Sequence, residues 1–177
     1  MDFTIRPVRP EEYEALGELT GRAYLDDGFL LHGADDWYYG HLRNVAGRAE
    51  LAEVLAAVDA DGTVLGGVTF VPAPGVMGDR ARPGETEIRM LAVDRAARGR
   101  GVGEALVRAC VERARTVLGC WGSPRRRQGA IVLSTQPEMR TAHRIYERLG
   151  FRRVPERDWA PIPEKPDFLL LCYALEL

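Results

Sequence analysis

The chain has 177 residues, of which 46% are hydrophobic and 28% are charged, a balance that is ordinary for one soluble globular domain. Its net charge of −2 disfavours a nucleic-acid-binding protein, because such proteins usually carry a basic excess. Three widely spaced cysteines without a CxxC pair argue against a disulfide framework and against a structural zinc site. Since the sequence also lacks a signal-peptide pattern and an apolar run of membrane length, we expect a cytoplasmic protein with a single domain over residues 1–177.

The first half of the chain predicts a strand, two helices and a hairpin. Residues 3–6 alternate ahead of two prolines and indicate a short strand. A helix is expected from Pro10, because a proline and two acids occupy its first turn, and a shorter helix is expected at 37–44. The segments 53–58 and 63–70 flank an Asp-Ala-Asp-Gly turn, which is typical of a β-hairpin.

The second half alternates strands with helices. Residues 88–93 are almost continuously apolar, which indicates a central strand covered on both faces. A long helix is expected at 102–118, where apolar residues recur at intervals of three and four. Three further elements complete the chain: a strand at 130–133, a helix that starts at Pro137 and a strand at 168–175. This order predicts an α/β domain with a mixed central sheet of about six to seven strands, flanked by about four helices.

A glycine-rich segment, Arg98-Gly99-Arg100-Gly101-Val102-Gly103, joins the strand at 88–93 to the long helix. Glycines let the backbone approach a ligand closely, and the first N–H groups of a helix have no internal partner, so phosphate or pyrophosphate is the natural ligand. Two familiar phosphate motifs do not fit. No Gly-Lys pair occurs for a P-loop, and Glu104 stands where the dinucleotide fingerprint needs its third glycine.

The spacing that fits is Arg/Gln-x-x-Gly-x-Gly/Ala, which Arg98, Gly101 and Gly103 meet. With the preceding residues 90–94, it resembles the acyl-CoA signature of the GCN5-related N-acetyltransferase (GNAT) superfamily. Residues 142–151 carry a second match, Ala-x-x-x-Tyr-x-x-x-Gly-Phe, on the helix after the following strand. The resemblance covers nearly the whole chain and implies a GNAT-like domain that uses acetyl-CoA as its co-substrate and needs no metal.

The resemblance also implies how the donor is held. The backbone groups of Leu91, Ala92 and Val93 pair with the pantetheine arm like an added strand, and one N–H polarises the thioester carbonyl. The family often has an asparagine that contacts CoA seven residues before Tyr146, and this chain has Met139 there, which argues against that contact but not against the fold. The pyrophosphate is held by the glycine-rich segment together with the residue after it, that is, by Arg98, Gly99, Arg100, Gly101, Val102, Gly103 and Glu104. These seven residues are called the glycine segment below.

Acetyl transfer from a thioester to an amine requires a base, because an alkyl ammonium with a pKa of about 10 is not a nucleophile. Our candidate is Glu87, since the resemblance implies a glutamate eleven residues before Arg98 that takes the amine proton directly or through water. A solvated glutamate at a strand end is the alternative, and Glu85 is a weaker substitute. The candidate acid is Tyr146, which the resemblance puts beside the CoA sulfur, and its alternative role is to pack on the core.

The sequence therefore predicts an acetyl-CoA-dependent N-acetyltransferase that acts on a primary amine by direct attack. We expect a monomer or a homodimer without nucleic-acid or membrane partners. The alternative is a non-catalytic acyl-CoA sensor or partner module on the same fold. The presence of both Glu87 and Tyr146 favours the enzyme, since a sensor needs neither, and transfer of a longer acyl group stays open.

The amine acceptor is not identified by the sequence. By resemblance, the acids within 26–36 border the acceptor site and would suit a cationic amine, although a plain polar loop is equally consistent with them. The aromatic residues at 37–39 either line an acceptor pocket or pack in the interior. The arginines at 125–127 either reach the 3′-phosphate of CoA or belong to a solvated loop, and the second reading is favoured.

Overall fold

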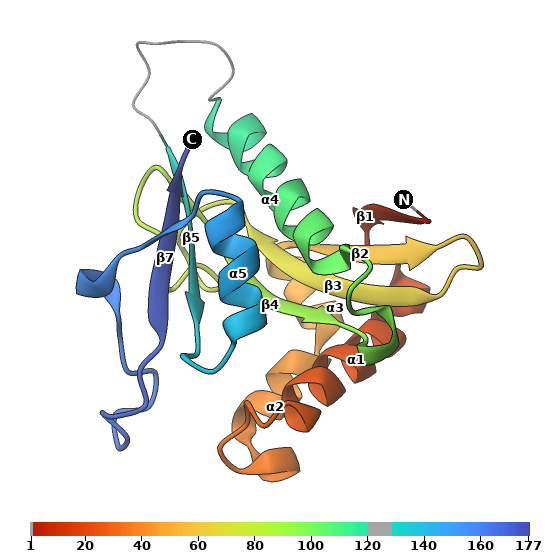
Figure 1. Ribbon diagram of the computed structural model, residues 1–177, viewed down its shortest axis with the longest axis horizontal. Helices are drawn as coiled ribbons and strands as arrows, with labels where there is room; N and C mark the ends of the chain where they lie inside the picture. The colour runs from red at the N-terminus through yellow and green to blue at the C-terminus, as the bar shows by residue number, and fades with distance from the viewer. Residues whose placement is uncertain (1, 120–128) are drawn as a thin grey trace.

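The structure is a computed structural model that describes residues 2–119 and 129–177 (Figure 1). Seven strands form one mixed sheet in the order β1-β2-β3-β4-β5-β7-β6. Only β4 and β5 run parallel to each other, and the other neighbours are antiparallel. The strands are β1 (Phe3–Pro7), β2 (Glu53–Asp59), β3 (Val64–Val71), β4 (Glu85–Val93), β5 (Ala130–Thr135), β6 (Arg152–Arg153) and β7 (Leu171–Glu176).

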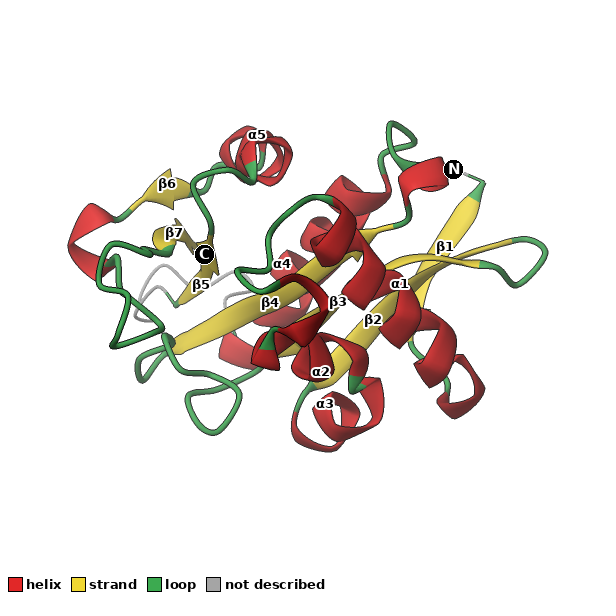
Figure 2. Ribbon diagram, turned by 90° about the horizontal axis from the view of Figure 1, so that it is seen from below, coloured by secondary structure: helices red, strands yellow, loops and turns green. Residues whose placement is uncertain are grey.

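The described residues form five α-helices, which cover both faces of the sheet. The helices are α1 (Tyr13–Asp26), α2 (Trp37–Arg43), α3 (Val45–Leu51), α4 (Val102–Leu118) and α5 (Arg140–Arg148). Figure 2 shows α1, α2 and α3 gathered over β2, β3 and β4. Adjacent residues of β2 point to opposite faces: Val54 packs with Leu16 of α1, whereas Leu55 belongs to the large core that also contains Leu106 of α4 and Tyr146 of α5.

The predicted α/β domain with a mixed sheet is confirmed, and the differences are local. The helix α3 was not expected; it starts where the Asn44 side chain accepts a hydrogen bond from the Gly47 N–H at 2.9 Å. The helix expected from Pro137 begins at Arg140, because a turn in which the Met139 N–H bonds the Gln136 carbonyl precedes it. The last strand begins at Leu171 rather than 168, and the two-residue strand β6 was not predicted.

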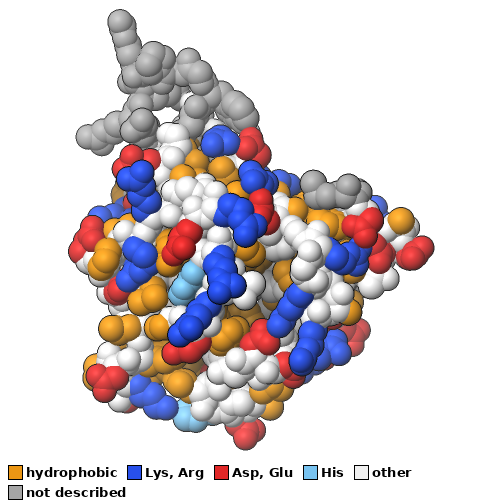
Figure 3. All heavy atoms as spheres, in the orientation of Figure 1, with side chains coloured by type: hydrophobic (Ala, Val, Ile, Leu, Met, Phe, Trp, Pro, Cys, Tyr) orange, Lys and Arg blue, Asp and Glu red, His pale blue; other side chains and the backbone are white. Residues whose placement is uncertain are grey.

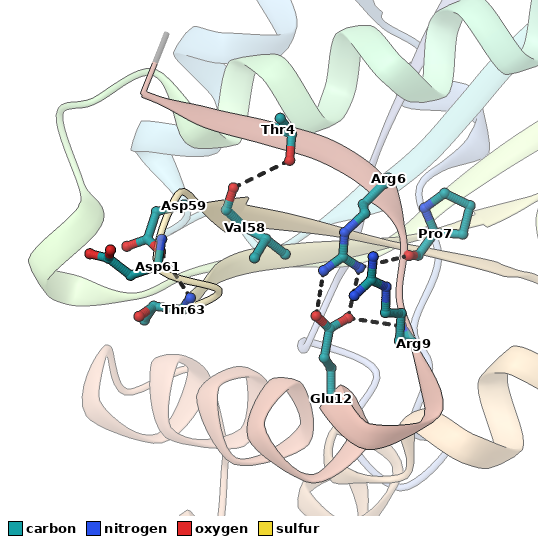
Figure 4. Close-up of polar contacts among 9 residues, drawn as sticks. All are labelled: Thr4, Arg6, Pro7, Arg9, Glu12, Val58, Asp59, Asp61 and Thr63. Carbon is teal, nitrogen blue, oxygen red and sulfur yellow. Dashed lines mark hydrogen bonds and ion pairs between the residues drawn. The ribbon is translucent and has the colours of Figure 1, made fainter.

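Polar contacts at the N-terminal edge set the direction of the chain into α1 (Figure 4). The Arg6 guanidinium donates to both oxygens of Glu12, at 2.8 and 2.5 Å, and the Arg9 N–H donates to Glu12 at 2.8 Å. At the β2–β3 hairpin, an Asp59 oxygen accepts the N–H groups of Asp61 and Thr63 at 3.0 and 2.9 Å. These contacts are local in sequence, which is why the first strand, first helix and hairpin were predictable.

An opening in the sheet between β4 and β5 positions the site. The two strands pair only as far as Ile88 and Leu133, and beyond that point they diverge, with α5 beside the opening (Figure 1). Opposite β3, the pairing steps from Gly67–Ala92 to Thr69–Arg89, so β4 holds an extra residue there. This is a β-bulge, in which Met90 has a φ of +53°. Residues 89–93 of β4 therefore leave their edge free on the side of β5.

Candidate active site

A groove of about 470 Å³ lies on one side of this opening, between the end of β4, the start of α4 and helix α5. Its lining includes Leu91, Ala92 and Val93, together with all but one residue of the glycine segment. The exception is Arg100, whose guanidinium forms an ion pair with Asp2 at 2.5 Å. The structure therefore brings the strand end and the glycine segment, which the sequence linked only by order, to one surface.

The glycine segment presents backbone rather than side chains to the groove. Gly99 and Gly101 both have a φ of +82°, a left-handed conformation that glycine adopts without strain. The backbone hydrogen bond that starts α4 runs from the Ala105 N–H to the carbonyl of the cap residue Gly101, at 3.0 Å. The N–H groups of residues 102–104 come before it, at the positive end of the helix dipole, and these residues line the groove. This is the geometry of an anion site.

The groove is bordered by cations that the sequence analysis did not single out. Arg140, Arg144 and Arg148 line it along α5, and their spacing of four residues, which places them on one side of a helix, was the available signal. Figure 3 shows Lys and Arg side chains gathered over this part of the surface. The Arg98 side chain instead makes two hydrogen bonds to Asp27 at 3.0 and 2.7 Å, so it ties the glycine segment to the end of α1.

A second cavity, of about 290 Å³, lies on the other side of the opening. It is lined by β4, by the start of α2 with the loop before it, by the residues after β5 and by the segment that leads into β7. Tyr24, Phe29 and Met139 line both cavities, so the two are contiguous at the divergence of β4 and β5. This arrangement allows two ligands to meet there.

The candidate base Glu87 lines the second cavity and is 2% exposed. Its Oε2 accepts the backbone N–H groups of Arg80 and Ala81, at 3.0 and 3.1 Å. Burial raises the pKa of the Glu87 carboxyl above its ordinary value of 4.5, although these N–H groups and Arg89 oppose the shift. Within the described residues, Oε1 accepts no hydrogen bond, so this oxygen is left for a ligand in the cavity.

Glu85, the substitute candidate, is committed to a different interaction. Its two oxygens accept hydrogen bonds from the buried Arg157 at 2.8 and 2.9 Å, and one also accepts the Arg82 N–H at 2.8 Å. Burial acts against ionisation of Glu85, but these bonds outweigh it and lower its pKa. Because Glu85 lines neither cavity among the described residues, it serves the fold rather than a ligand.

Tyr146 packs in the core between α5 and β7, with ring centroids 5.8 Å from Phe151 and 6.0 Å from Tyr173. Burial raises the pKa of its phenol. In the described part of the chain it lines neither cavity, so its role as an acid stays a prediction. Tyr24 of α1 lines both cavities, and its own phenol pKa is raised well above 10.0 by burial and by the nearby hydroxyls of Tyr38 and Tyr146. No spacing in the sequence had marked Tyr24.

Other residues of the second cavity were also missed. Arg89 follows Glu87 by two positions, so strand alternation would have placed both on one face. Asp79 and Trp159 lie in segments without a recognisable pattern, and only the tertiary structure brings them to the cavity. The arginines at 125–127 fall outside the described residues. Across residues 2–119 and 129–177, no cluster of metal-ligating side chains is found, and no helix is long and apolar enough to cross a membrane.

The site thus combines a sheet that opens beside a glycine-rich turn, a groove on one side of the opening and an acid-containing cavity on the other. Residues 14–151 match the Acetyltransferase (GNAT) family. The chain belongs to this family.

Solved structures of similar fold include acetyltransferases. An acetyltransferase of the GNAT family from Staphylococcus aureus has a TM-score of 0.70, with 16% identity and 99% of each chain covered. YncA from Salmonella typhimurium, solved with acetyl-CoA, has a TM-score of 0.67, with 22% identity and coverage of 100% of this chain and 95% of that one. A phosphinothricin acetyltransferase from Sinorhizobium meliloti, in complex with acetyl-CoA, has a TM-score of 0.68, with 15% identity and coverage of 100% and 89%.

One curated relative is similar in sequence. The N-acetylaspartate synthetase of Danio rerio is 36% identical over 77 residues, which are 44% of this chain and 24% of that protein. The match thus spans about a quarter of the relative's length.

Proposed function

We propose that the chain is an acetyl-CoA-dependent N-acetyltransferase that moves an acetyl group from the CoA thioester to a primary amine by direct attack. The observation that carries this proposal is the position of Glu87, a buried carboxylate with one free oxygen, in a cavity contiguous with the groove at the glycine segment. Two GNAT structures of similar fold contain acetyl-CoA, which supports the same donor here.

The groove fits a long polyanion such as CoA. In the proposed complex, the residues from Arg98 to Glu104 hold the pyrophosphate, chiefly through the N–H groups of residues 101–104, because the Arg98 and Arg100 N–H groups already bond backbone carbonyls. The arginines of α5 surround the remaining phosphate charge. The free edge of β4 at Leu91, Ala92 and Val93 pairs with the pantetheine arm, as an added strand would. A backbone N–H of this edge polarises the thioester carbonyl. The thioester then lies at the opening between β4 and β5, where the two cavities meet.

In the reaction, Glu87 accepts a proton from the bound ammonium, directly or through water, and passes it to solvent. The free amine nitrogen attacks the thioester carbonyl carbon, a C–N bond forms and the C–S bond breaks. The departing CoA sulfur takes the phenol proton of Tyr146, and the second proton lost by nitrogen restores the phenol. The raised pKa of Glu87 makes its carboxylate a stronger base than an ordinary glutamate, which favours uptake of the ammonium proton.

Tyr146 is the proposed donor to the CoA sulfur, and a matched pair of tyrosine variants tests this. A raised phenol pKa keeps the Tyr146 hydroxyl protonated, as a donor must be. We expect Tyr146→Phe to lower kcat by about tenfold to 100-fold, with KM for acetyl-CoA unchanged, because only protonation of the leaving thiolate is lost. For Tyr24→Phe we expect a smaller loss of kcat, measured in the same steady-state assays. Full activity of Tyr146→Phe would exclude it as the donor, and a loss confined to Tyr24→Phe would assign the role to Tyr24.

The function itself is tested by offering the protein acetyl-CoA and a broad panel of primary amines while free CoA thiol is monitored. We expect thiol release that depends on the amine, with the acetamide product found by mass spectrometry. Calorimetric titration with acetyl-CoA runs alongside. Binding of acetyl-CoA without turnover of any amine would establish the acyl-CoA-binding module instead of the enzyme, and absence of binding would reject both.

A further inference from the structure

The second cavity is unusually aromatic for its size. At about 290 Å³ it lies at the small end of ligand pockets, so the group it takes is small. Leu31 and Trp37, which are 41% and 60% exposed, leave apolar surface open beside it. Its aromatic lining consists of Tyr24, Phe29, Trp37, Tyr38, Trp159 and Phe168. A lining of this kind favours an aromatic or branched apolar group over a hydrophilic chain.

The charged groups of the cavity are three carboxylates and one guanidinium, at Asp36, Asp79, Glu87 and Arg89. Asp36 caps α2, since one of its oxygens accepts the Tyr38 N–H at 2.9 Å and the other accepts the His32 N–H at 3.3 Å. This carboxylate is therefore used by the fold. Its charge still makes the cavity less suited to an anion.

The guanidinium of Arg89 is paired through one of its terminal nitrogens. Its Nη1 donates to the Asp79 carboxylate at 2.9 Å and to the Met77 carbonyl at 2.7 Å. Arg89 is the one cation that lines the cavity among the described residues, so a ligand carboxylate would find it neutralised. Among the described residues, the Glu87 carboxylate forms no ion pair and its Oε1 accepts no hydrogen bond, so this oxygen attracts an ammonium.

An α-amino acid would fit this arrangement poorly. Its carboxylate is two bonds from the amine, so an amine bound to Glu87 would hold a second negative charge beside the Glu87 carboxylate. Such like charges in a buried site repel strongly, and among the described residues that line the cavity the one cation, Arg89, is already paired with Asp79. An amine without a carboxylate avoids this repulsion and still fills the aromatic cavity.

We infer that the acceptor is a small arylalkyl or branched apolar primary amine without a carboxylate, and that Asp79 excludes amino acids by neutralising Arg89. This inference rests on the proposed acetyltransferase function. Asp79 is a specificity residue, because it acts on the acceptor through Arg89 and takes no part in the transfer.

Four acceptors with acetyl-CoA test the inference: 2-phenylethylamine, phenylalaninamide, phenylalanine and 1,5-diaminopentane. We expect kcat/KM for 2-phenylethylamine to exceed that for phenylalanine by about 100-fold or more, as one repelled carboxylate requires. Phenylalaninamide separates charge from size, because it matches phenylalanine in shape without its negative charge, and we expect it to stay close to 2-phenylethylamine. The diamine tests whether a hydrophilic cation suffices, and we expect it to be a poor acceptor.

The Asp79→Asn variant gives the second test. It removes the charge that neutralises Arg89 and keeps the shape of the side chain, so kcat/KM for phenylalanine should rise by about tenfold. The readout is the ratio of kcat/KM for phenylalanine to kcat/KM for 2-phenylethylamine, which should rise in the variant. Asp35→Asn is the matched control, because this exposed acid lies outside both cavities and the same charge change there should leave the preference unchanged.

The outcomes separate the inference from the function on which it rests. A preference for phenylalanine or for the diamine over 2-phenylethylamine, with acetyl transfer intact, overturns the inference alone. An Asp79→Asn variant that keeps the wild-type preference removes the role of Asp79. Absence of transfer to every amine, in a protein that binds acetyl-CoA, rejects the acetyltransferase function and the inference with it.

Discussion

Replacing Glu87 with glutamine is expected to lower kcat for amine acetylation by about 10²-fold to 10⁴-fold near neutral pH, the usual contribution of a positioned base. Glutamine keeps the size of the side chain, and its carbonyl oxygen can accept the N–H groups of Arg80 and Ala81, so the fold is retained. What is lost is the capacity to take the ammonium proton. Steady-state rates with saturating acetyl-CoA measure the effect.

The pH profile distinguishes a base from a binding residue. In the wild type, activity should rise with pH as the Glu87 carboxyl, whose pKa lies above 4.5, loses its proton. The Glu87→Gln variant lacks this rise, because it depends on amine that is already deprotonated in solution. Its rate should therefore approach the wild-type rate as the pH approaches about 10, the pKa of an alkyl ammonium. A variant rate equal to that of the wild type at every pH would remove Glu87 as the base.

Glu85→Gln is the matched control for this prediction. It makes the same chemical change two residues away, at a carboxylate that is paired with Arg157 and lines neither cavity. We expect it to lower thermal stability, because Arg157 loses a charged partner, and to keep the wild-type pH profile of activity. If Glu85→Gln rather than Glu87→Gln lost the rise of activity with pH, Glu85 would be the base and Glu87 a residue that serves the fold.

Stability should report the same pKa of Glu87 independently of catalysis. An acid whose pKa is raised on folding binds more protons in the folded state than in the unfolded state. The free energy of unfolding of the wild type therefore falls as the pH rises from 4.5 through the raised pKa. Glu87→Gln should remove this part of the slope, which denaturant titrations of both proteins across that pH range can measure.

Replacing Gly103 with leucine is expected to weaken acetyl-CoA binding by about 100-fold or more, because the added side chain fills the groove between α4 and α5. A Cβ at Gly103 would lie 3.1 Å from the Ile145 Cδ1 and 3.5 Å from the Val93 Cγ2, and all three residues line the groove. Gly103→Ala should cost far less, since the terminal methyl of Ile145 can shift. Calorimetric titration with acetyl-CoA measures both effects.

The control for this prediction is Gly40→Leu on α2, where no atom lies within 4 Å of an added Cβ. Leucine favours a helix over glycine by about 1 kcal/mol, so both leucine variants should fold. We expect Gly40→Leu to bind acetyl-CoA as the wild type does. Wild-type affinity in a folded Gly103→Leu variant would place the donor outside this groove.

What the sequence by itself determined is local in origin. The bounds predicted for α4, at 102 and 118, agree with the structure because periodic apolar residues and flanking glycines specify a helix through near neighbours. The glycine segment was recognisable for the same reason, since its conformation and the free N–H groups of α4 depend on adjacent residues. Glu87 was predicted as the base from its offset from Arg98, which a continuous strand and turn preserve.

Only the tertiary structure decided how these parts meet. The β-bulge at Met90 and the parting of β4 from β5 create the opening, and both depend on pairing between strands far apart in sequence. The burial that raises the pKa of Glu87, and the pairing of Asp79 with Arg89, arise from packing of distant segments. Burial and charge neutralisation are properties of a residue's surroundings, and a sequence read without contacts does not contain them.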